Sequence, residues 1–350
     1  MMSHMYSRYR NTLYVYLTLL VLLPLMIGSC KNSTPTTNKS PLGQRAEYAI
    51  VIHGGAGVMD KTKMSADLIA RYEAALSAAL DVGEGILKKG GTAIDAVEQT
   101  IRLMEDDSLF NAGRGAVFAS DGHNSLDASI MVGANKDAGA VAGVSIIRHP
   151  ISAARAVMEQ SPHVMMSGAG ADSFATMMDL EVVTPSYFYN HGRWNSLQRA
   201  KAREAKQLQK EKTAKYGTVG CVALDKYGHI VAGTSTGGMT NKKYDRIGDS
   251  PVIGAGTFAD DATCGVSATG HGEYFIRHTV ARDIAAMMQY GNKTLSEAAD
   301  YIIHDVLVSA GGDGGVVALD RFGNIAMPFN TSGMYRGYRK PGEQSVQIFK

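Results

Sequence analysis

The sequence has little excess of charge of either sign. Its 350 residues include 35 Lys and Arg against 33 Asp and Glu, which gives a formal net charge of +2 at pH 7. The basic residues are spread along the chain and form no stripe that would bind a phosphate backbone. Nucleic acid is therefore not an expected partner. The 45% content of hydrophobic residues is typical of a globular protein with a sizeable core.

Cysteine is scarce as well. The chain has three cysteines, Cys30, Cys221 and Cys264, which are too few for a disulfide framework. Cys221 and Cys264 stand in apolar or glycine-rich segments with the character of strands. We expect both of them to be buried free thiols.

A long apolar run, residues 13–27, lies near the start of the chain and contains Pro24. It is shorter than the roughly 20 residues that a membrane-spanning helix needs. Two arginines precede it, as in bacterial signal peptides. Residues 1–30 are therefore predicted to be an export signal.

The end of this segment predicts a lipid anchor. Residues 27–30, Ile-Gly-Ser-Cys, resemble a lipobox, which makes Cys30 the predicted lipidation site. Acyl chains on Cys30 would hold the protein at a membrane, with the polar residues 31–46 as a flexible tether. We expect an exported lipoprotein in the periplasm or at the cell surface.

Glycine, in contrast, is abundant, and most of the 39 residues cluster next to Thr, Asn and Asp. This pattern suggests a site built from backbone amides. An apolar run at residues 48–53 predicts a buried strand that ends in a flexible turn at residues 54–57. Further strands are predicted at residues 116–118, 129–132 and 140–147.

Residues 190–217 are rich in Lys, Arg, Gln, Asn and Glu, which predicts an exposed, partly helical linker. A strand, turn and returning strand follow at residues 219–233, and the same pattern recurs at residues 317–326. Helices are predicted at residues 274–290 and 294–309. Strands and helices that occur in separate blocks favour an α+β fold with antiparallel sheets layered against helices.

The segment Gly217-Thr218-Val219-Gly220 lies where the linker meets a buried strand. A threonine hydroxyl is a weak nucleophile unless a base lies beside it, and its own α-amino group can serve once the preceding peptide bond is cut. Gly217 suits that cut, because it has no side chain and allows its carbonyl a strained geometry. An ordinary threonine at the start of a strand is the alternative, and the neighbouring motifs decide between the two.

Several of these motifs offer the other parts of a site. Thr236 ends the returning strand beside Thr218, where it can orient the nucleophile. Thr269 and Gly270 end another strand and offer a hydroxyl and an amide for an oxyanion hole. In the loop between these strands, an arginine and an aspartate three residues apart fit the α-carboxylate and α-ammonium groups of an amino acid.

These motifs resemble those of the plant-type asparaginase/isoaspartyl peptidases, which are N-terminal-nucleophile hydrolases. The resemblance covers nearly all of residues 48–337. It is carried by GTVG at Thr218, TSTGGMTNK ending at Lys242, RIGDSP at Arg246, TGHGE at Thr269, HGGAG at His53, SLFNAGRGAVF at Ser108, LDASIM at Leu126 and PFNTSGMYRG near the end of the chain.

The resemblance implies a four-layer αββα sandwich and a precursor that cuts itself between Gly217 and Thr218. The α subunit, residues 47–217, and the β subunit, residues 218–350, would form one composite domain, and two such pairs a heterotetramer. The implied reaction is hydrolysis of isoaspartyl (β-aspartyl) peptides and L-asparagine to release L-aspartate, so the expected partner is a small molecule or a peptide.

The resemblance also implies a role for each matching residue. Thr218 would be the nucleophile with its freed amine as the general base, and Thr236 would assist it. Thr269 and Gly270 would form the oxyanion hole, and Asn111 would fix the site. The implied substrate-binding residues are Arg246, Ile247, Gly248, Asp249, Thr269, Gly270, His271 and Gly272. Among these, His271 departs from the family, where a smaller hydroxyl residue is expected.

The loop from residue 104 to 114 resembles one that binds a structural sodium ion. The ligands would be backbone carbonyls, and no organic cofactor is implied. The implied carbonyls are those of Met104, Glu105, Asp107, Phe110, Ala112 and Arg114.

Two other functions remain open on the sequence. A glycosylasparaginase acting on N-linked glyco-asparagine would use the same nucleophile, although the GMTNK and RIGDSP segments favour the asparaginase branch. The second alternative is a surface binding lipoprotein built on an inactive scaffold. The joint presence of Thr218, Thr236 and Thr269 argues against it.

Overall fold

The computed structural model describes residues 45–206 and 217–350. The predicted signal peptide with Cys30, nearly all of the predicted tether and residues 207–216 of the predicted linker lie outside the described residues. Within the described part of the chain, no helix has the length and apolar character needed to cross a membrane.

The secondary structure consists of strands and helices in alternating blocks. The strands are β1 (Ala49–Gly57), β2 (Leu126–Val132), β3 (Ala138–Val144), β4 (Met165–Ser167), β5 (Val219–Leu224), β6 (Ile230–Thr236), β7 (Thr257–Ala259), β8 (Cys264–Gly270), β9 (Gly314–Asp320), β10 (Ile325–Ala326), β11 (Gly333–Lys340) and β12 (Glu343–Phe349). The α-helices are α2 (Ala66–Lys88), α3 (Ala93–Asp106), α4 (Pro150–Gln160), α5 (Gly168–Met177), α6 (His191–Ala205), α7 (Gly272–Arg277), α8 (Val280–Gly291), α9 (Leu295–Asp300) and α10 (Leu307–Ala310).

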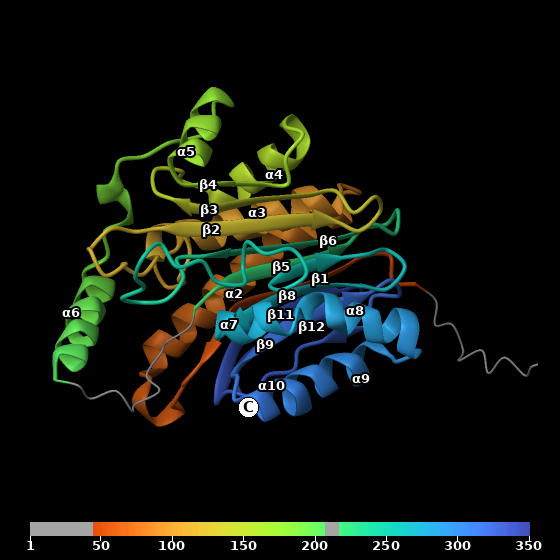
Figure 1. Cartoon of the computed structure of the whole chain (residues 1–350). Helices are drawn as coiled ribbons and strands as arrows, with labels where there is room; N and C mark the ends of the chain where they lie inside the picture. The colour runs from red at the N-terminus through yellow and green to blue at the C-terminus, as the bar shows by residue number, and fades with distance from the viewer. Residues whose placement is uncertain (1–44, 207–216) are drawn as a thin grey trace, which may run out of the picture. The chain divides into compact units, whose positions relative to one another are not determined.

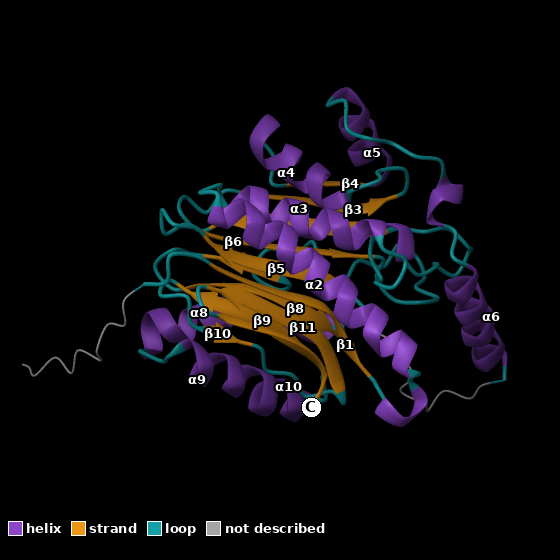
Figure 2. Ribbon diagram, turned by 180° about the vertical axis from the view of Figure 1, so that it is seen from behind, coloured by secondary structure: helices purple, strands orange, loops and turns teal. Residues whose placement is uncertain are grey.

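Two sheets pack face to face between two layers of helices (Figure 1). The larger sheet has the strand order β12-β11-β1-β5-β6-β2-β3-β4, and the smaller one β10-β9-β8-β7. Helices α2, α3 and α4 cover the outer face of the larger sheet, as Figure 2 shows for α2 and α3, and α8 and α9 cover the smaller one. The layers are those of the predicted αββα sandwich.

The central strands are buried on both faces. Side chains alternate along a strand, so Ile50 and Ile52 of β1 pack toward the helices of the larger sheet, and Val51 packs toward the smaller sheet. Cys221 and Cys264 are both buried free thiols, as predicted. Two apolar layers therefore hold the central strands in place from both sides.

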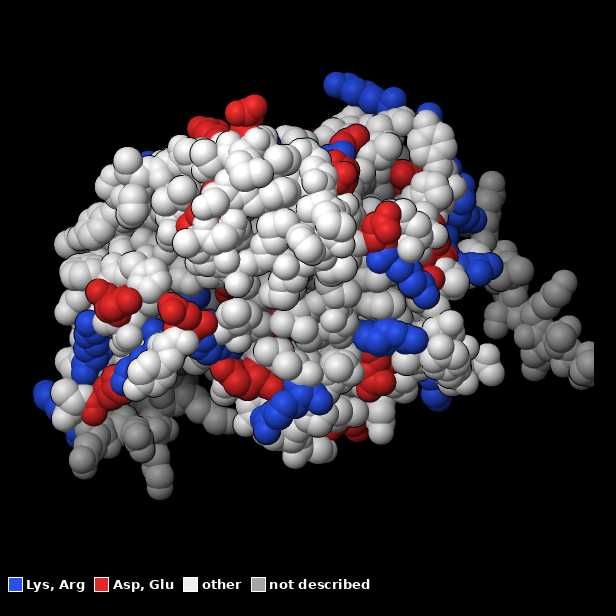
Figure 3. All heavy atoms as spheres, turned by 45° about the horizontal axis from the view of Figure 1, so that its top comes forward, with Lys and Arg blue, Asp and Glu red and all other residues white. Residues whose placement is uncertain are grey.

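Many charged side chains lie at the surface, outside these layers, although a few such as Glu105 are buried. On the face drawn in Figure 3, Lys and Arg side chains are interspersed with Asp and Glu, around a broad area without charged groups. On this face, therefore, no single sign of charge dominates.

The predicted helices near the C-terminus are present but interrupted. The helix predicted at residues 274–290 is broken into α7 and α8, because Thr279 adopts a left-handed conformation with φ 43°. Thr294 caps α9 in a reciprocal capping box with Glu297. After α9 the chain runs through a π-helical turn, Tyr301–Val306, before α10.

Three other expectations were wrong or incomplete. Residues 54–57 are not a turn, because β1 continues through them and pairs with β11 across a bulge between His53 and Gly55. Residues 116–118 are not a strand, since the N–H of Val117 bonds the side chain of Asn111. The predicted linker is anchored where it is described, because Arg193 of α6 donates to carbonyls of the loop that follows α3.

Candidate active site

Thr218 lies immediately before β5, opposite the end of β6. The pairing of Val219 with Ser235 sets this register, and it brings the hydroxyl of Thr218 to 3.2 Å from that of Thr236. Thr236 Oγ1 in turn donates to the carbonyl of Gly217 at 3.2 Å and accepts from the N–H of Gly238 at 3.0 Å. The predicted nucleophile, its neighbour and the predicted cleavage bond are thus in contact.

Gly217 is packed against Asn111. A Cβ at Gly217 would lie 2.8 Å from Asn111 Cβ, which is closer than side chains normally approach. Asn111 is itself fixed, because its Nδ2 donates to the carbonyl of Gly238 at 2.8 Å and its Oδ1 accepts from Val117. Glycine is therefore required at the predicted cut, and Asn111 forms one wall beside it.

Thr269 and Gly270 form the end of β8. Thr269 is fully buried, and its Oγ1 accepts from the N–H of Ala56 at 3.2 Å. Gly270 lines the same cavity as Thr218 and Thr236. The glycine-rich end of β1 and the end of β8 thus support each other at this place.

Arg246 and Asp249 lie beside the two threonines in a tightly packed loop. Both line the cavity with Thr218 and Gly248. A Cβ at Gly248 would meet Arg246 Nη1 at 2.7 Å, and one at Gly272 would meet Asp249 Oδ1 at 2.7 Å. The two glycines make room for the charged groups.

Arg246 already has a carboxylate partner. Its Nε and Nη2 donate to the two oxygens of Glu273, each at 2.8 Å. This is the bidentate geometry that a substrate α-carboxylate would also use. Glu273 was not among the predicted site residues, although it is the last residue of the TGHGE motif that begins at Thr269.

Asp249 has an unusual acidity. Burial raises the pKa of its carboxyl group to about 7, and its Oδ2 is buried with no hydrogen-bond partner within the described residues. A cationic group that approached this oxygen would stabilise the ionised form. The site therefore has an acceptor placed for an ammonium group.

Ile247 and His271 lie at the edge of the site. The side chain of Ile247 is 40% exposed, and Nε2 of His271 lies 3.2 Å from the carboxylate of Glu273. Within the described residues, neither side chain is part of the lining of the cavity beside Thr218. Their contact with substrate stays a prediction.

The cavity beside Thr218 is small. Its volume is about 10 Å³, which is room for about one water molecule. Gly217 forms part of its lining. A substrate of the size of asparagine would need space that the uncut chain occupies.

The predicted cation loop, residues 104–114, begins in the last turn of α3 and includes Asn111. Two carbonyl oxygens lie close to its glycines, because a Cβ at Gly113 would be 2.3 Å from the carbonyl oxygen of Glu105 and one at Gly115 would be 1.9 Å from that of Phe110. The carbonyls of Met104, Asp107 and Ala112 each accept an N–H within the loop, and each keeps a second lone pair. Backbone oxygens of this kind fit a hard cation.

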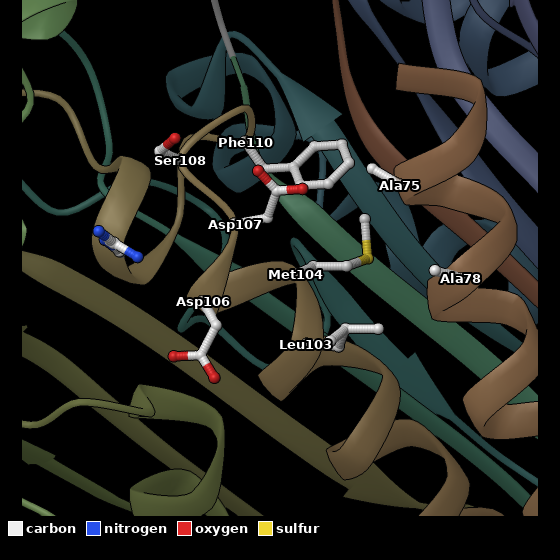
Figure 4. Close-up of a pocket in the computed structure, with 9 residues that line it drawn as sticks. Ala75, Ala78, Leu103, Met104, Asp106, Asp107, Ser108 and Phe110 are labelled. Atoms are coloured by element: carbon white, nitrogen blue, oxygen red, sulfur yellow. The ribbon is translucent and has the colours of Figure 1, made fainter. Parts of the chain in front are cut away.

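A cavity of about 350 Å³ adjoins this loop. Figure 4 shows Met104 and Phe110 facing Ala75 and Ala78 of α2 across it. Within the described residues, no cluster of three or more His, Cys, Asp or Glu side chains is placed to hold a metal ion.

A buried glutamate connects the same loop to β6. Glu105 accepts from Ser235 Oγ at 2.6 Å and from the N–H of Ile151 at 3.1 Å. Burial raises its pKa to about 8. Glu105 therefore joins the end of α3 to the residue beside Thr236.

The comparisons with known proteins agree with this arrangement. The sequence profile of a family described as asparaginase matches residues 46–348. The chain is 48% identical over 299 residues to the isoaspartyl peptidase of Escherichia coli (strain K12), covering 84% of this chain and 93% of that protein. It is 47% identical over 299 residues to the isoaspartyl peptidase of Salmonella typhimurium, covering 84% and 96%.

A more distant relative is matched over a similar length of the chain. The chain is 38% identical over 296 residues to the isoaspartyl peptidase/L-asparaginase of Homo sapiens, covering 84% of this chain and 94% of that protein. The match spans the two sheets, the cation loop and every residue placed around the cavity. On these grounds the chain belongs to the asparaginase family.

Proposed function

We propose that the protein is a self-cleaving threonine amidohydrolase that hydrolyses isoaspartyl peptides and L-asparagine to L-aspartate. The observation that carries the proposal is the row of contacts from Thr218 Oγ1 to Thr236 Oγ1 and on to the carbonyl of Gly217. The relatives at 47% and 48% identity are named isoaspartyl peptidases, which supports the substrate class.

The first step is the cut of the chain before Thr218. Thr218 Oγ1 attacks the carbonyl carbon of Gly217 while Thr236 hydrogen-bonds to the carbonyl oxygen, on which negative charge develops. The C–N bond then breaks, the nitrogen takes up a proton, and Gly217 is held as an ester on Thr218. Water hydrolyses the ester and leaves a carboxylate on Gly217 and a free α-amino group on Thr218.

The freed amine then serves as the base for the substrate reaction. It takes the proton of Thr218 Oγ1, which attacks the side-chain carbonyl of the aspartyl group. Thr269 and the N–H of Gly270 stabilise the oxyanion. Ammonia or the amine of a peptide leaves with the proton, and water hydrolyses the β-aspartyl ester to aspartate.

Two charged residues would fix the substrate. Arg246 binds the α-carboxylate, which takes over from Glu273 one or both of the hydrogen bonds seen here. Asp249 accepts from the α-ammonium group with its unpartnered Oδ2. This pair favours an aspartyl group with both α-groups free, as in asparagine and isoaspartyl dipeptides.

We also propose the assembly and the ion that the family resemblance implies. Two α subunits and two β subunits form a heterotetramer. A sodium ion held by carbonyls of residues 104–114 would stiffen the loop that carries Asn111 and would take no part in bond making. The carbonyl oxygens close to Gly113 and Gly115 support this assignment.

The location is the remaining proposal. The export signal and the lipobox in residues 1–30 support a lipoprotein anchored through Cys30, in the periplasm or at the cell surface. Such an anchor would keep the enzyme near peptides outside the cytoplasm.

Intact mass measurement with N-terminal sequencing tests the proposal, on wild type and Thr218→Ala after incubation at neutral pH. We expect two fragments in wild type, one beginning Thr-Val-Gly, and an uncut variant. Cleaved wild type should release aspartate from β-aspartyl dipeptides and asparagine but not from glycosylated asparagine. An uncut wild type would refute the catalytic proposal, and the mass of the α fragment shows whether it begins at an acylated Cys30.

A further inference from the structure

The imidazole of His53 lies behind the nucleophile. His53 is fully buried on β1. Its Nδ1 is 3.0 Å from the carbonyl oxygen of Thr218, and its Nε2 is 3.0 Å from Ser267 Oγ on β8. One side chain thus connects β1, the residue before β5 and β8, which lie far apart in the sequence.

The contacts of His53 determine where its proton sits. Burial lowers the pKa of His53 to about 3, so the ring is neutral and has one N–H. The carbonyl of Thr218 can only accept. The proton therefore belongs on Nδ1, and Nε2 accepts from Ser267.

A row of buried hydroxyls between the sheets is compatible with this tautomer. Ser267 Oγ lies 2.6 Å from Thr234 Oγ1, which accepts from Thr257 Oγ1 at 2.6 Å. When Ser267 donates to Nε2 it can accept from Thr234, whose hydroxyl also lies 3.2 Å from the carbonyl oxygen of Gly256. The tautomer itself is fixed by the carbonyl of Thr218, which can only accept.

The backbone cannot provide the bond that His53 makes. The ladder between β1 and β5 ends at the pair His53 and Gly220, and β1 bulges directly afterwards. Thr218 lies beyond that last pair. Gly220 leaves the space for the ring, because a Cβ there would lie 2.3 Å from His53 Nε2 and 2.0 Å from Ser267 Oγ.

We propose that His53 is a positioning residue for Thr218, through the bond from its Nδ1–H to the carbonyl of Thr218. The inference rests on the proposed function of Thr218. After the cut, Thr218 has lost its covalent bond on the N-terminal side, so this bond limits its rotation about the chain. The orientation of Oγ1 and of the new amine depends on that restraint.

Two amide side chains separate the functions of the two ring nitrogens. In His53→Asn the amide nitrogen takes the place of Nδ1 and keeps the bond to Thr218. In His53→Gln the amide oxygen takes the place of Nε2, accepts from Ser267 as Nε2 does, and makes no bond to Thr218. We expect self-cleavage and kcat of the Asn variant within about 5-fold of wild type, and those of the Gln variant about 10–100-fold lower with KM little changed.

A purely structural role would slow both variants alike, and that result would overturn the proposal. Thermal unfolding of both variants in the uncut Thr218→Ala chain checks that their folds are equally stable. Nitrogen-15 NMR of histidine in that same chain reads the tautomer without a His53 substitution. A protonated Nδ1 is expected, and a protonated Nε2 would refute the proposal even if wild type cleaves normally.

Discussion

Two hairpins of this protein share one sequence pattern, but only one of them begins at the proposed nucleophile. The first joins β5 to β6 through Asp225, and the second joins β9 to β10 through Asp320. Each aspartate accepts two backbone N–H groups of its own turn, at 3.0 Å in the first and at 2.8 and 3.0 Å in the second. The glycines that close the turns both have positive φ, 94° and 83°. The turns are therefore nearly the same structure.

The hairpins differ at the ends away from the turn. Strand β6 runs for seven residues and ends with Thr236 beside Thr218, whereas β10 has only two residues. Strand β9 begins with Gly314 and Gly315, which pair with Gly270 and Thr269 of β8. A shared turn fixes the register of a hairpin. The length of the returning strand decides which residue lies opposite the start of the hairpin.

The largest expected effect comes from the hydroxyl that only the first hairpin has. In Thr236→Val the side chain keeps its shape but no longer donates to the carbonyl of Gly217. We expect self-cleavage to slow by about 10²-fold, as for the loss of one oxyanion-hole donor. The rate at which the fragment beginning at Thr218 appears is the measurement. Thr236→Ser keeps a hydroxyl and should lose far less, and a Val variant that cleaves at the wild-type rate would contradict the assigned role.

The two turns offer a matched pair of substitutions. Asp225→Ala and Asp320→Ala each leave two turn N–H groups without their acceptor, and each should lower the free energy of unfolding by about 1–3 kcal/mol. Each also loses one further bond, from the N–H of Ala93 to Asp225 and from Asn324 Nδ2 to Asp320. Urea unfolding in the Thr218→Ala background compares them on uncut chains. With Thr218 restored, only Asp225→Ala should slow self-cleavage, by about 10-fold through the lost orientation of Thr218 and Thr236. Equal slowing by both would show that hairpin register does not control the site.

A smaller effect concerns the support of β6 and depends on pH. Burial raises the pKa of Glu105 from 4.5 to about 8, so the folded chain binds a proton that the unfolded chain releases. This contribution to stability is complete below pH 4.5 and is lost as the pH rises to 8, by about 1.4 kcal/mol per pH unit at its steepest. Urea unfolding of the Thr218→Ala chain between pH 5 and 8 should show this slope.

Glu105→Gln keeps an acceptor for Ser235 without a titrating proton. We expect the pH slope to become shallower in this variant, while the contribution of Asp249, whose pKa burial raises to about 7, remains. The matched variant Glu204→Gln removes an exposed carboxylate that bonds Asn241, and it should leave the slope in place. An unchanged slope in Glu105→Gln would mean that the stability of β6 depends on another titrating group.

Local signals in the sequence were sufficient for much of the fold. The turn at Asp225 and the capping box at Thr294 depend on neighbouring residues, and both are found. Tertiary contacts decided the places where prediction was wrong. The glycines after His53 form a strand because β11 pairs with them, and Val117 is not in a strand because Asn111 takes its N–H.

The contacts of the candidate site can also be divided into those that the sequence predicts and those that only the folded structure shows. The contact of Thr218 with Thr236 follows from a hairpin register that the sequence indicates. The contacts of Glu273 with Arg246 and of His53 with Thr218 join residues from separate motifs. Both residues stand inside motifs visible in the sequence, but only the folded chain shows which group each one binds.

The narrow space beside Thr218 has a consequence for how activity would appear in time. In the uncut chain Gly217 still lines a cavity of about 10 Å³, which is too small for a substrate of the size of asparagine. If the proposed function holds, each molecule is inactive until the bond between Gly217 and Thr218 is cut, and it is active afterwards. The specific activity of a sample then rises with the time since folding, and a fresh preparation begins with a lag.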